Sequence, residues 1–220
     1  VSVTFNNINF MNGKITNSNG AAINIAQGSS VTVTNSNFNN MYAAMGGAIC
    51  TLDNYVSITV INSSFLSTNA IYTGGAIYTM YGNLNVINST FQDAEANDAG
   101  AIRSNGGSVN VTGSTFINTN ARWHGGAIYT QSDSFTVTNS TFINNKAQQG
   151  GGAIYGYKNT ENIAVIDSKF ENCQSPIDGS DIYSAGPLTL LSNDYDGKTT
   201  YNSTEVKCNS IINIVSGSFA

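Results

Sequence analysis

Short runs of alternating apolar and polar residues recur along the chain. The clearest are Val31–Val33, Val56–Ile58, Leu84–Val86, Val109–Val111, Phe135–Val137, Ile163–Val165 and Leu188–Leu190. Alternation with a period of two sends one set of side chains to each side of an extended backbone, which is typical of a half-buried strand. The pattern therefore predicts a succession of short strands.

Two further markers return with the same interval as the strands. An aromatic residue stands at Phe10, Phe38, Phe65, Phe91, Phe116, Phe142, Phe170 and Tyr195, with spacings of 28, 27, 26, 25, 26, 28 and 25 residues. A GGAI tetrad, or a degenerate copy of it, stands at Gly20–Ile23, Gly46–Ile49, Gly74–Ile77, Ala99–Ile102, Gly125–Ile128, Gly151–Ile154 and Gly179–Ile182. Two markers that keep one period over seven copies establish a structural repeat.

Each repeat has the size of one turn of a solenoid. A unit of this length cannot bury its own apolar face, whereas stacked parallel coils can. A propeller blade needs a longer period, and a leucine-rich repeat needs Leu at several fixed positions. We therefore expect an all-β fold, a single-stranded right-handed parallel β-helix of about eight coils of 25–28 residues. The repeat domain covers residues 1–198, and residues 199–220 form an irregular final coil or C-terminal cap.

Several columns of side chains should run along such a solenoid. We expect the aromatic residues and the tetrad isoleucines to point inward, and the tetrad glycines to mark a tight corner where a Cβ would clash or φ must be positive. Three positions before each aromatic stands a turn residue: Asn7, Asn35, Asn62, Asn88, Gly113, Asn139, Asp167 or Ser192. These residues should take the left-handed backbone conformation, which Asn tolerates.

Composition narrows the functional classes. Only 10% of the 220 residues are charged, the net charge is −5 and the basic residues are scattered, which argues against a nucleic-acid partner. No apolar run approaches the length of about 18 residues that crosses a bilayer, so direct membrane insertion is not expected. The chain starts inside a strand pattern without a signal peptide. We expect a mature fragment or domain of a larger secreted protein.

The strings NSTFQDAEANDAGAI (Asn88–Ile102) and NSTFINNKAQQGGGAIY (Asn139–Tyr155) resemble the repeats of adhesin-like surface proteins of methanogenic archaea. This resemblance extends to about Leu191 and implies a right-handed β-helix in an extracellular, cell-surface protein. The GGAI tetrad is also similar to that of chlamydial polymorphic outer-membrane proteins, but their FxxN motif is met only at Phe142–Asn145. Neither resemblance implies a particular ligand or catalytic residues.

The expected function is that of an adhesin-type or structural binding module, which contacts glycans or proteins of another cell or neighbouring copies of itself. The alternatives are a polysaccharide lyase or glycoside hydrolase, a passive spacer and an ice-binding surface. An enzyme of this kind needs acids in register on neighbouring coils, and Asp93 and Glu95 have no acidic equivalents one coil later. We therefore expect no enzyme, no catalytic residue, no cofactor and no metal site. The pair His124 and Asp98 stays open as an acid–base pair.

Ligand contacts are expected in the variable loops before the tetrads, because loops carry function on a solenoid. The candidates are Tyr42, Tyr72, Arg122, Trp123 and His124. Their aromatic and polar groups suit a sugar ring, although Trp123 could instead cover a neighbouring coil. The residues after the tetrads predict an outward ladder, which serves either stability or binding: Tyr78, Arg103, Tyr129, Tyr155 and Tyr183.

The sequence also contains candidate modification and cross-linking sites. Sequons for glycosylation occur at Asn62, Asn88, Asn110, Asn139 and Asn202. Three of these asparagines are already expected as turn residues of the repeat: Asn62, Asn88 and Asn139. Of the three cysteines, Cys50 and Cys173 lie too many coils apart for a disulfide, whereas Cys173 and Cys208 stay open as a pair.

Overall fold

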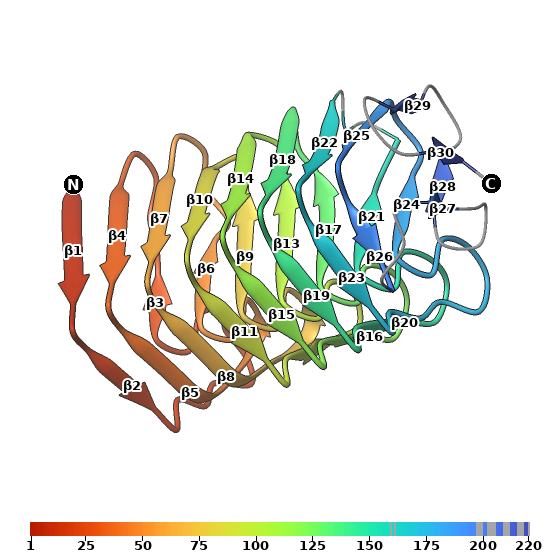
Figure 1. Cartoon of the computed structure of the whole chain (residues 1–220). Helices are drawn as coiled ribbons and strands as arrows, with labels where there is room; N and C mark the ends of the chain where they lie inside the picture. Colours follow the sequence, from red (N-terminus) through yellow and green to blue (C-terminus); the bar gives the residue numbers. More distant parts are fainter. Residues whose placement is uncertain are drawn as a thin grey trace.

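The chain winds into a solenoid whose coils follow one another along a single axis, as the computed structural model shows (Figure 1). The structure describes residues 1–158, 160, 162–196, 200–201, 206–208, 212–214 and 218–219. Among these residues, no helix is long and apolar enough to cross a membrane. The expected all-β parallel solenoid is confirmed.

Three parallel sheets run the length of the solenoid. The nine-stranded first sheet consists of β1 (Ser2–Asn6), β4 (Ser30–Thr34), β7 (Ser57–Ile61), β10 (Asn83–Ile87), β14 (Ser108–Thr112), β18 (Ser134–Thr138), β22 (Ile163–Ile166), β25 (Leu188–Leu191) and β29 (Ile212–Ile214). The eleven-stranded second sheet consists of β2 (Asn9–Met11), β5 (Asn37–Met45), β8 (Ser64–Thr73), β11 (Thr90–Gln92), β15 (Thr115–Ile117), β19 (Thr141–Ile143), β23 (Lys169–Glu171) and β26 (Asp194–Tyr195), with a branch from β8 through β12 (Glu95–Ala96), β16 (Asn120–Ala121) and β20 (Lys146–Ala147). The eight-stranded third sheet consists of β3 (Ile23–Asn24), β6 (Ile49–Thr51), β9 (Ile77–Met80), β13 (Ile102–Asn105), β17 (Ile128–Gln131), β21 (Ile154–Gly156), β24 (Ile182–Ser184) and β28 (Val206–Cys208). A small fourth sheet pairs β27 (Thr200–Tyr201) with β30 (Ser218–Phe219).

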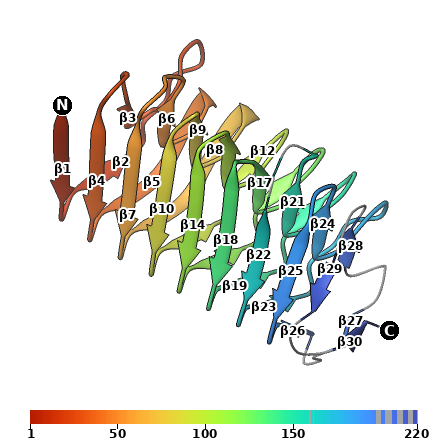
Figure 2. The same cartoon turned by 90° about the horizontal axis from the view of Figure 1, so that it is seen from above.

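Strands of the three long sheets pair in parallel with their equivalents one coil away. Figure 2 shows the first-sheet strands lying side by side in chain order. The pairing places equivalent residues opposite one another, as with Val60 and Val86 or Ile128 and Ile154. Each position of the repeat therefore becomes a column along the axis. Within residues 199–220, β28 and β29 extend the third and first sheets by one further strand each.

A stack of aromatic rings forms the centre of the core. Phe38, Phe65, Phe91, Phe116, Phe142, Phe170 and Tyr195 are all fully buried. From Phe10 to Tyr195, the centroids of neighbouring rings lie 4.5 to 5.2 Å apart and their planes are within 9° of parallel. The tetrad isoleucines are buried as well. Both predicted inward columns are confirmed.

Two columns of left-handed turn residues bend each coil. The predicted column, three positions before each aromatic, has φ values between 48° and 58° at all eight positions. A second column, which the sequence analysis did not single out, lies two positions after the aromatic: Asn12, Asn40, Ser67, Asp93, Asn118, Asn144 and Asn172. Its side chains also bond along the axis, since Asn118 Nδ2 donates to Asp93 Oδ1 at 3.0 Å.

The tetrad glycines occupy the predicted corner, and the two positions are under different constraints. The first has a positive φ, as at Gly125 with 64°, and Ala99 takes its place with a φ of 56°. The second touches the next coil: a Cβ on Gly126 would lie 1.9 Å from the carbonyl oxygen of Gly152. In the coils from Gly47 to Gly152, only a residue without a side chain allows the two backbones to approach so closely, whereas the first and last copies of the tetrad have Ala21 and Ser180 at this position.

A ladder of buried serines stabilises the turn between the first and second sheets. Its members are Ser36, Ser63, Ser89, Ser114, Ser140 and Ser168. Each Oγ donates to the carbonyl two residues earlier and accepts a backbone N–H from the preceding coil, as Ser114 does from Ser89 at 3.1 Å. The recurring Asn-Ser-Thr-Phe string thus reads as a left-handed turn residue, a ladder serine, an outward residue and a core ring.

Replacing Ser114 with alanine is expected to lower the free energy of unfolding by about 1–3 kcal/mol, because the buried N–H of Ser89 loses its acceptor. Equilibrium unfolding in urea measures this loss. The matched control is Thr115→Ala, which removes a hydroxyl from the neighbouring position outside the ladder and should cost less than about 1 kcal/mol. Equal losses in the two variants would contradict a specific role for the serine ladder.

Candidate functional site

A row of outward side chains crosses the coils on the branch of the second sheet. It consists of Tyr42, Asn69, Glu95, Asn120 and Lys146, which pair in register from coil to coil. The parallel register places one of these side chains on every coil, at the strand spacing of about 4.8 Å. The row is therefore a regular line of polar groups parallel to the solenoid axis.

A second row lies two residues further along each coil, and the two rows enclose a groove. The second row consists of Ile71, Asn97, Arg122 and Gln148, and the alanines Ala70, Ala96 and Ala121 lie between the rows. The groove is open to solvent and has a volume of about 600 Å³. Because its lining comes from several consecutive coils, its long direction follows the axis.

The lining of this groove is rich in hydrogen-bonding groups. Four side-chain amides, those of Asn69, Asn97, Asn120 and Gln148, can each donate and accept. Arg122 and Lys146 add positive charge, and Glu95 is the one carboxylate among the lining residues. Such a surface matches a ligand that carries many hydroxyl or carboxylate groups along an extended chain.

Two of the predicted ligand-contact residues line the groove, and two more lie at its edge. Tyr42 and Arg122 are part of the lining. Tyr72 and Trp123 are 58% and 46% exposed, one residue beyond the second row. The Trp123 backbone N–H donates to the carbonyl of Asn97, and the Tyr72 carbonyl accepts from Asp98. The two exposed rings therefore follow the second row directly along the chain, on coils that are two apart.

His124 has a different environment from the other four candidates. Its Nδ1 lies 3.0 Å from Asp98 Oδ1, and its ring packs 4.5 Å from the ring of Tyr155. The structure therefore brings the two members of the open acid–base pair together. Neither His124 nor Asp98 lines the groove, and their contact joins the loops of two neighbouring coils.

The residues after the tetrads form a continuous stack in register. Tyr155 and Tyr183 lie with ring centroids 4.6 Å apart, and the Arg103 guanidinium lies 3.4 Å from the ring centroid of Tyr129. The column is largely covered, because Tyr78 and Tyr129 are only 4% and 7% exposed. Burial raises the pKa of both phenols above the usual value. At these two positions the ladder contributes packing and is closed to a ligand.

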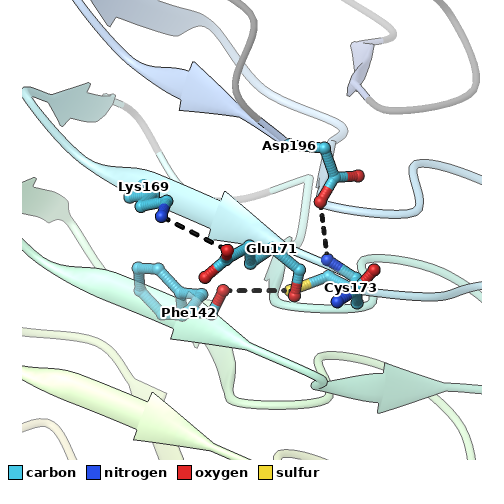
Figure 3. A network of polar contacts seen from close by, with 6 residues as sticks. Phe142, Lys169, Glu171, Cys173 and Asp196 are labelled. Carbon is cyan, nitrogen blue, oxygen red and sulfur yellow. Dashed lines mark hydrogen bonds and ion pairs between the residues drawn. The ribbon is translucent and has the colours of Figure 1, made fainter.

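Charged side chains near the C-terminal end of the second sheet make local contacts (Figure 3). Lys169 Nζ lies 3.3 Å from Glu171 Oε1, and Asp196 Oδ1 accepts the backbone N–H of Asn172 at 2.8 Å. Among the described residues, no three His, Cys, Asp or Glu side chains come together as a metal site. These acids serve the turns of the final coils.

No disulfide joins any two of the three cysteines, so the pairing of Cys173 with Cys208 that the sequence left open is not formed. Cys173 Sγ contacts the carbonyl oxygen of Phe142 at 3.5 Å, inside the core (Figure 3). Cys208 Sγ contacts the carbonyl oxygen of Gly186 at 3.4 Å. Burial raises the pKa of the Cys50 thiol to about 12, which keeps that group protonated and unreactive.

Four of the sequon asparagines are exposed: Asn62, Asn88, Asn110 and Asn139. Asn202 lies outside the described residues. In three of the sequons the residue after Asn is a ladder serine. The left-handed turn and the serine ladder therefore account for Asn-Ser at these places, while the amide groups remain accessible from solvent.

Most of the groove lining was missed by reasoning from the sequence. Asn69, Asn120 and Lys146 were not singled out, and Glu95 was noted only as an acid without an acidic equivalent one coil later. The signal that could have found them is positional, because each stands four residues after a core aromatic. The residue types differ from coil to coil, so no motif marks the row.

The fold and the groove together define a class of protein, the parallel β-solenoid with an axial polar groove. The chain belongs to the family described as the right handed beta helix region, whose model matches residues 1–170. No curated protein and no solved structure matches the chain. Family membership therefore establishes the fold, and the function has to be argued from the site.

Proposed function

We propose that the chain is an extracellular adhesin-type binding module of a cell-surface protein, and that its groove binds glycan chains of a partner surface. The observation that carries this proposal is the axial groove with its amides, its two cations and its alanine floor. The resemblance of the repeats to adhesin-like surface proteins of methanogenic archaea supports the same function.

The regular spacing of the lining favours an extended polymer over a compact ligand. Successive residues of each row lie about 4.8 Å apart, so a chain lying along the axis meets a new hydrogen-bonding group on every coil. Tyr72 and Trp123 add two exposed rings on one edge, two coils apart. Aromatic rings beside polar groups are the usual surface for stacking and orienting a ring-shaped ligand.

The groove favours binding over cleavage. Hydrolysis of a glycosidic bond uses two carboxyl groups about 5–9.5 Å apart on either side of the scissile bond. In the described part of the chain, Glu95 is the one carboxylate among the groove-lining residues. Binding without cleavage is therefore the expected outcome on any polymer that occupies the groove.

The test is a binding screen of the purified chain on an array of glycans and cell-wall polysaccharides, with product release measured on the same polymers. We expect saturable binding without cleavage. Trp123→Ala and the double variant Arg122→Ala/Lys146→Ala should each weaken binding at least about tenfold, equivalent to about 1.4 kcal/mol. The matched control is Lys169→Ala, which removes an exposed cation outside the groove.

Three outcomes would contradict the proposal. Cleavage would favour a lyase or hydrolase, and the search for its acid would begin at Glu95 and Asp98. The absence of binding to every polymer would favour a passive spacer. If Lys169→Ala weakened binding as much as the groove variants do, binding would depend on general charge and not on a site in the groove.

A further inference from the structure

Two exposed tyrosines occupy a backbone conformation that is unfavourable for them. Tyr55 and Tyr81 have φ values of 58° and 54°, and their side chains are 82% and 60% exposed. They stand on neighbouring coils at the turn from the third sheet to the first, just before β7 and β10. A bulky residue at positive φ is an outlier, and such outliers collect at functional sites.

The fold does not require tyrosine at this turn. The equivalent residues of the flanking coils are glycines, Gly28 with a φ of 66° and Gly106 with a φ of 72°. The equivalence follows from the register of the first-sheet strands, in which Ser30 pairs with Ser57, Ser57 with Asn83, and Leu84 with Val109. Glycine takes this conformation without cost. Tyrosine at these two positions therefore lowers the stability of the fold relative to glycine. It also leaves two large rings exposed to water.

The rings border two hollows that meet at Tyr81. One has a volume of about 440 Å³ and is lined by Asn54, Tyr55 and Tyr81. The other has the same volume, and its lining includes Tyr81, Asn105, Gly106, Gly107, Gln131 and Asp133. Gly106 makes room for the ring, because a Cβ there would lie 2.7 Å from Cδ1 of Tyr81. The hollows thus span four consecutive coils.

We infer that this tyrosine turn, Tyr55 and Tyr81 with the two hollows beside them, is a second binding site that takes an uncharged oligosaccharide. Exposed rings offer faces for stacking on sugar rings, and the amides and carboxylate of the lining offer partners for hydroxyl groups. Among the described residues, the lining holds Asp133 and no Lys or Arg, which disfavours acidic sugars. The site lies at a different corner of the coil from the groove. Binding at this site does not depend on the function proposed for the groove.

Substitution by glycine separates binding from folding. Tyr81→Gly and Tyr55→Gly remove the rings and also relieve the backbone, so we expect each variant to fold with an unchanged or higher Tm. Calorimetric titration with cellohexaose, xylohexaose, mannohexaose and laminarihexaose should show saturable binding of at least one sugar to the unmodified chain. Either glycine variant should weaken that binding at least tenfold. The control variant Lys169→Ala, which removes an exposed cation outside both sites, should bind the same sugar unchanged.

Several results would overturn the inference. One is that none of the four sugars binds, and another is that Tyr81→Gly binds as the unmodified chain does. A marked fall of Tm in both glycine variants would assign the rings to packing. A proline-rich peptide that binds at Tyr81 while all four sugars fail would replace the saccharide by a different class of ligand.

Discussion

Replacing Phe116 with alanine is expected to lower the free energy of unfolding by about 3–5 kcal/mol. The ring is fully buried and stacks between Phe91 and Phe142, with centroid distances of 4.8 and 4.9 Å. Both neighbours are held by the same parallel register, so the coils cannot close on the cavity without losing backbone hydrogen bonds. Urea unfolding followed by circular dichroism measures the change.

The matched control for this variant is Phe10→Ala. Phe10 belongs to the same stack, but it is only partly buried and has a parallel ring on one side, Phe38 at 4.6 Å. We expect it to cost about half as much as Phe116→Ala, because less apolar surface leaves the core. A cost below about 1 kcal/mol for Phe116→Ala would contradict a tightly packed aromatic core.

Replacing Gly126 with alanine is expected to cost about 3 kcal/mol or more, at the upper end for overpacking. The new Cβ would lie 1.9 Å from the Gly152 carbonyl oxygen and 2.6 Å from the Lys146 amide nitrogen. All of these are backbone atoms, so relief requires two coils to move apart. Thermal and urea unfolding of the purified variant give the change in stability.

The neighbouring glycine provides the control, because its constraints lie within one coil. A Cβ on Gly125 would lie 2.4 Å from the carbonyl oxygen of Ile128 in the same coil, and the residue has a positive φ, so no two coils have to move apart. Gly125→Ala should cost only about 1–2 kcal/mol, the penalty for a left-handed residue with a Cβ. The chain itself contains this substitution in another coil, where Ala99 has a φ of 56° and is fully buried. If the two variants lost equal stability, close backbone approach would not be the reason for the second glycine.

The fold could be predicted from the sequence because the same physical demand recurs in every coil. A position that faces the axis must hold an apolar side chain of similar size each time, so Phe91, Phe116 and Phe142 keep one residue type. A corner that needs positive φ favours Gly or Asn. Repetition turns these local demands into a visible period, and the period fixes the parallel register.

The candidate site could not be predicted in the same way. Outward positions face water, and packing places no common demand on them, so Tyr42, Asn69 and Glu95 occupy one row without chemical similarity. The strain at Tyr55 and Tyr81 is also hidden in the sequence, because it depends on φ angles that only the turn geometry sets. The repeat pattern of the sequence reflects the packing requirements of the core. It does not indicate what the surface binds.

The burial of the ladder of residues after the tetrads shows a third limit of prediction from the sequence. Alternation after the tetrad predicts that Tyr129 points away from the core, yet only 7% of this residue is exposed, because the loop of the same coil returns over it. His124 meets Tyr129 edge-on at 6.0 Å, and Arg103 lies on its face. Whether an outward residue is accessible depends on loops whose paths have no period, so exposure could not be inferred from the pattern.

The arrangement of hydrogen bonds also determines how the molecule would respond to a pulling force. Every coil is joined to its neighbours by backbone bonds that run along the axis, and β1 and β29 lie at opposite ends of the first sheet. Tension applied between the two ends would detach one coil at a time, each releasing about 90 Å of extended chain for a period of 26 residues. A tether built in this way lengthens in steps under load. A binding contact at one of its ends would therefore experience a lower peak force.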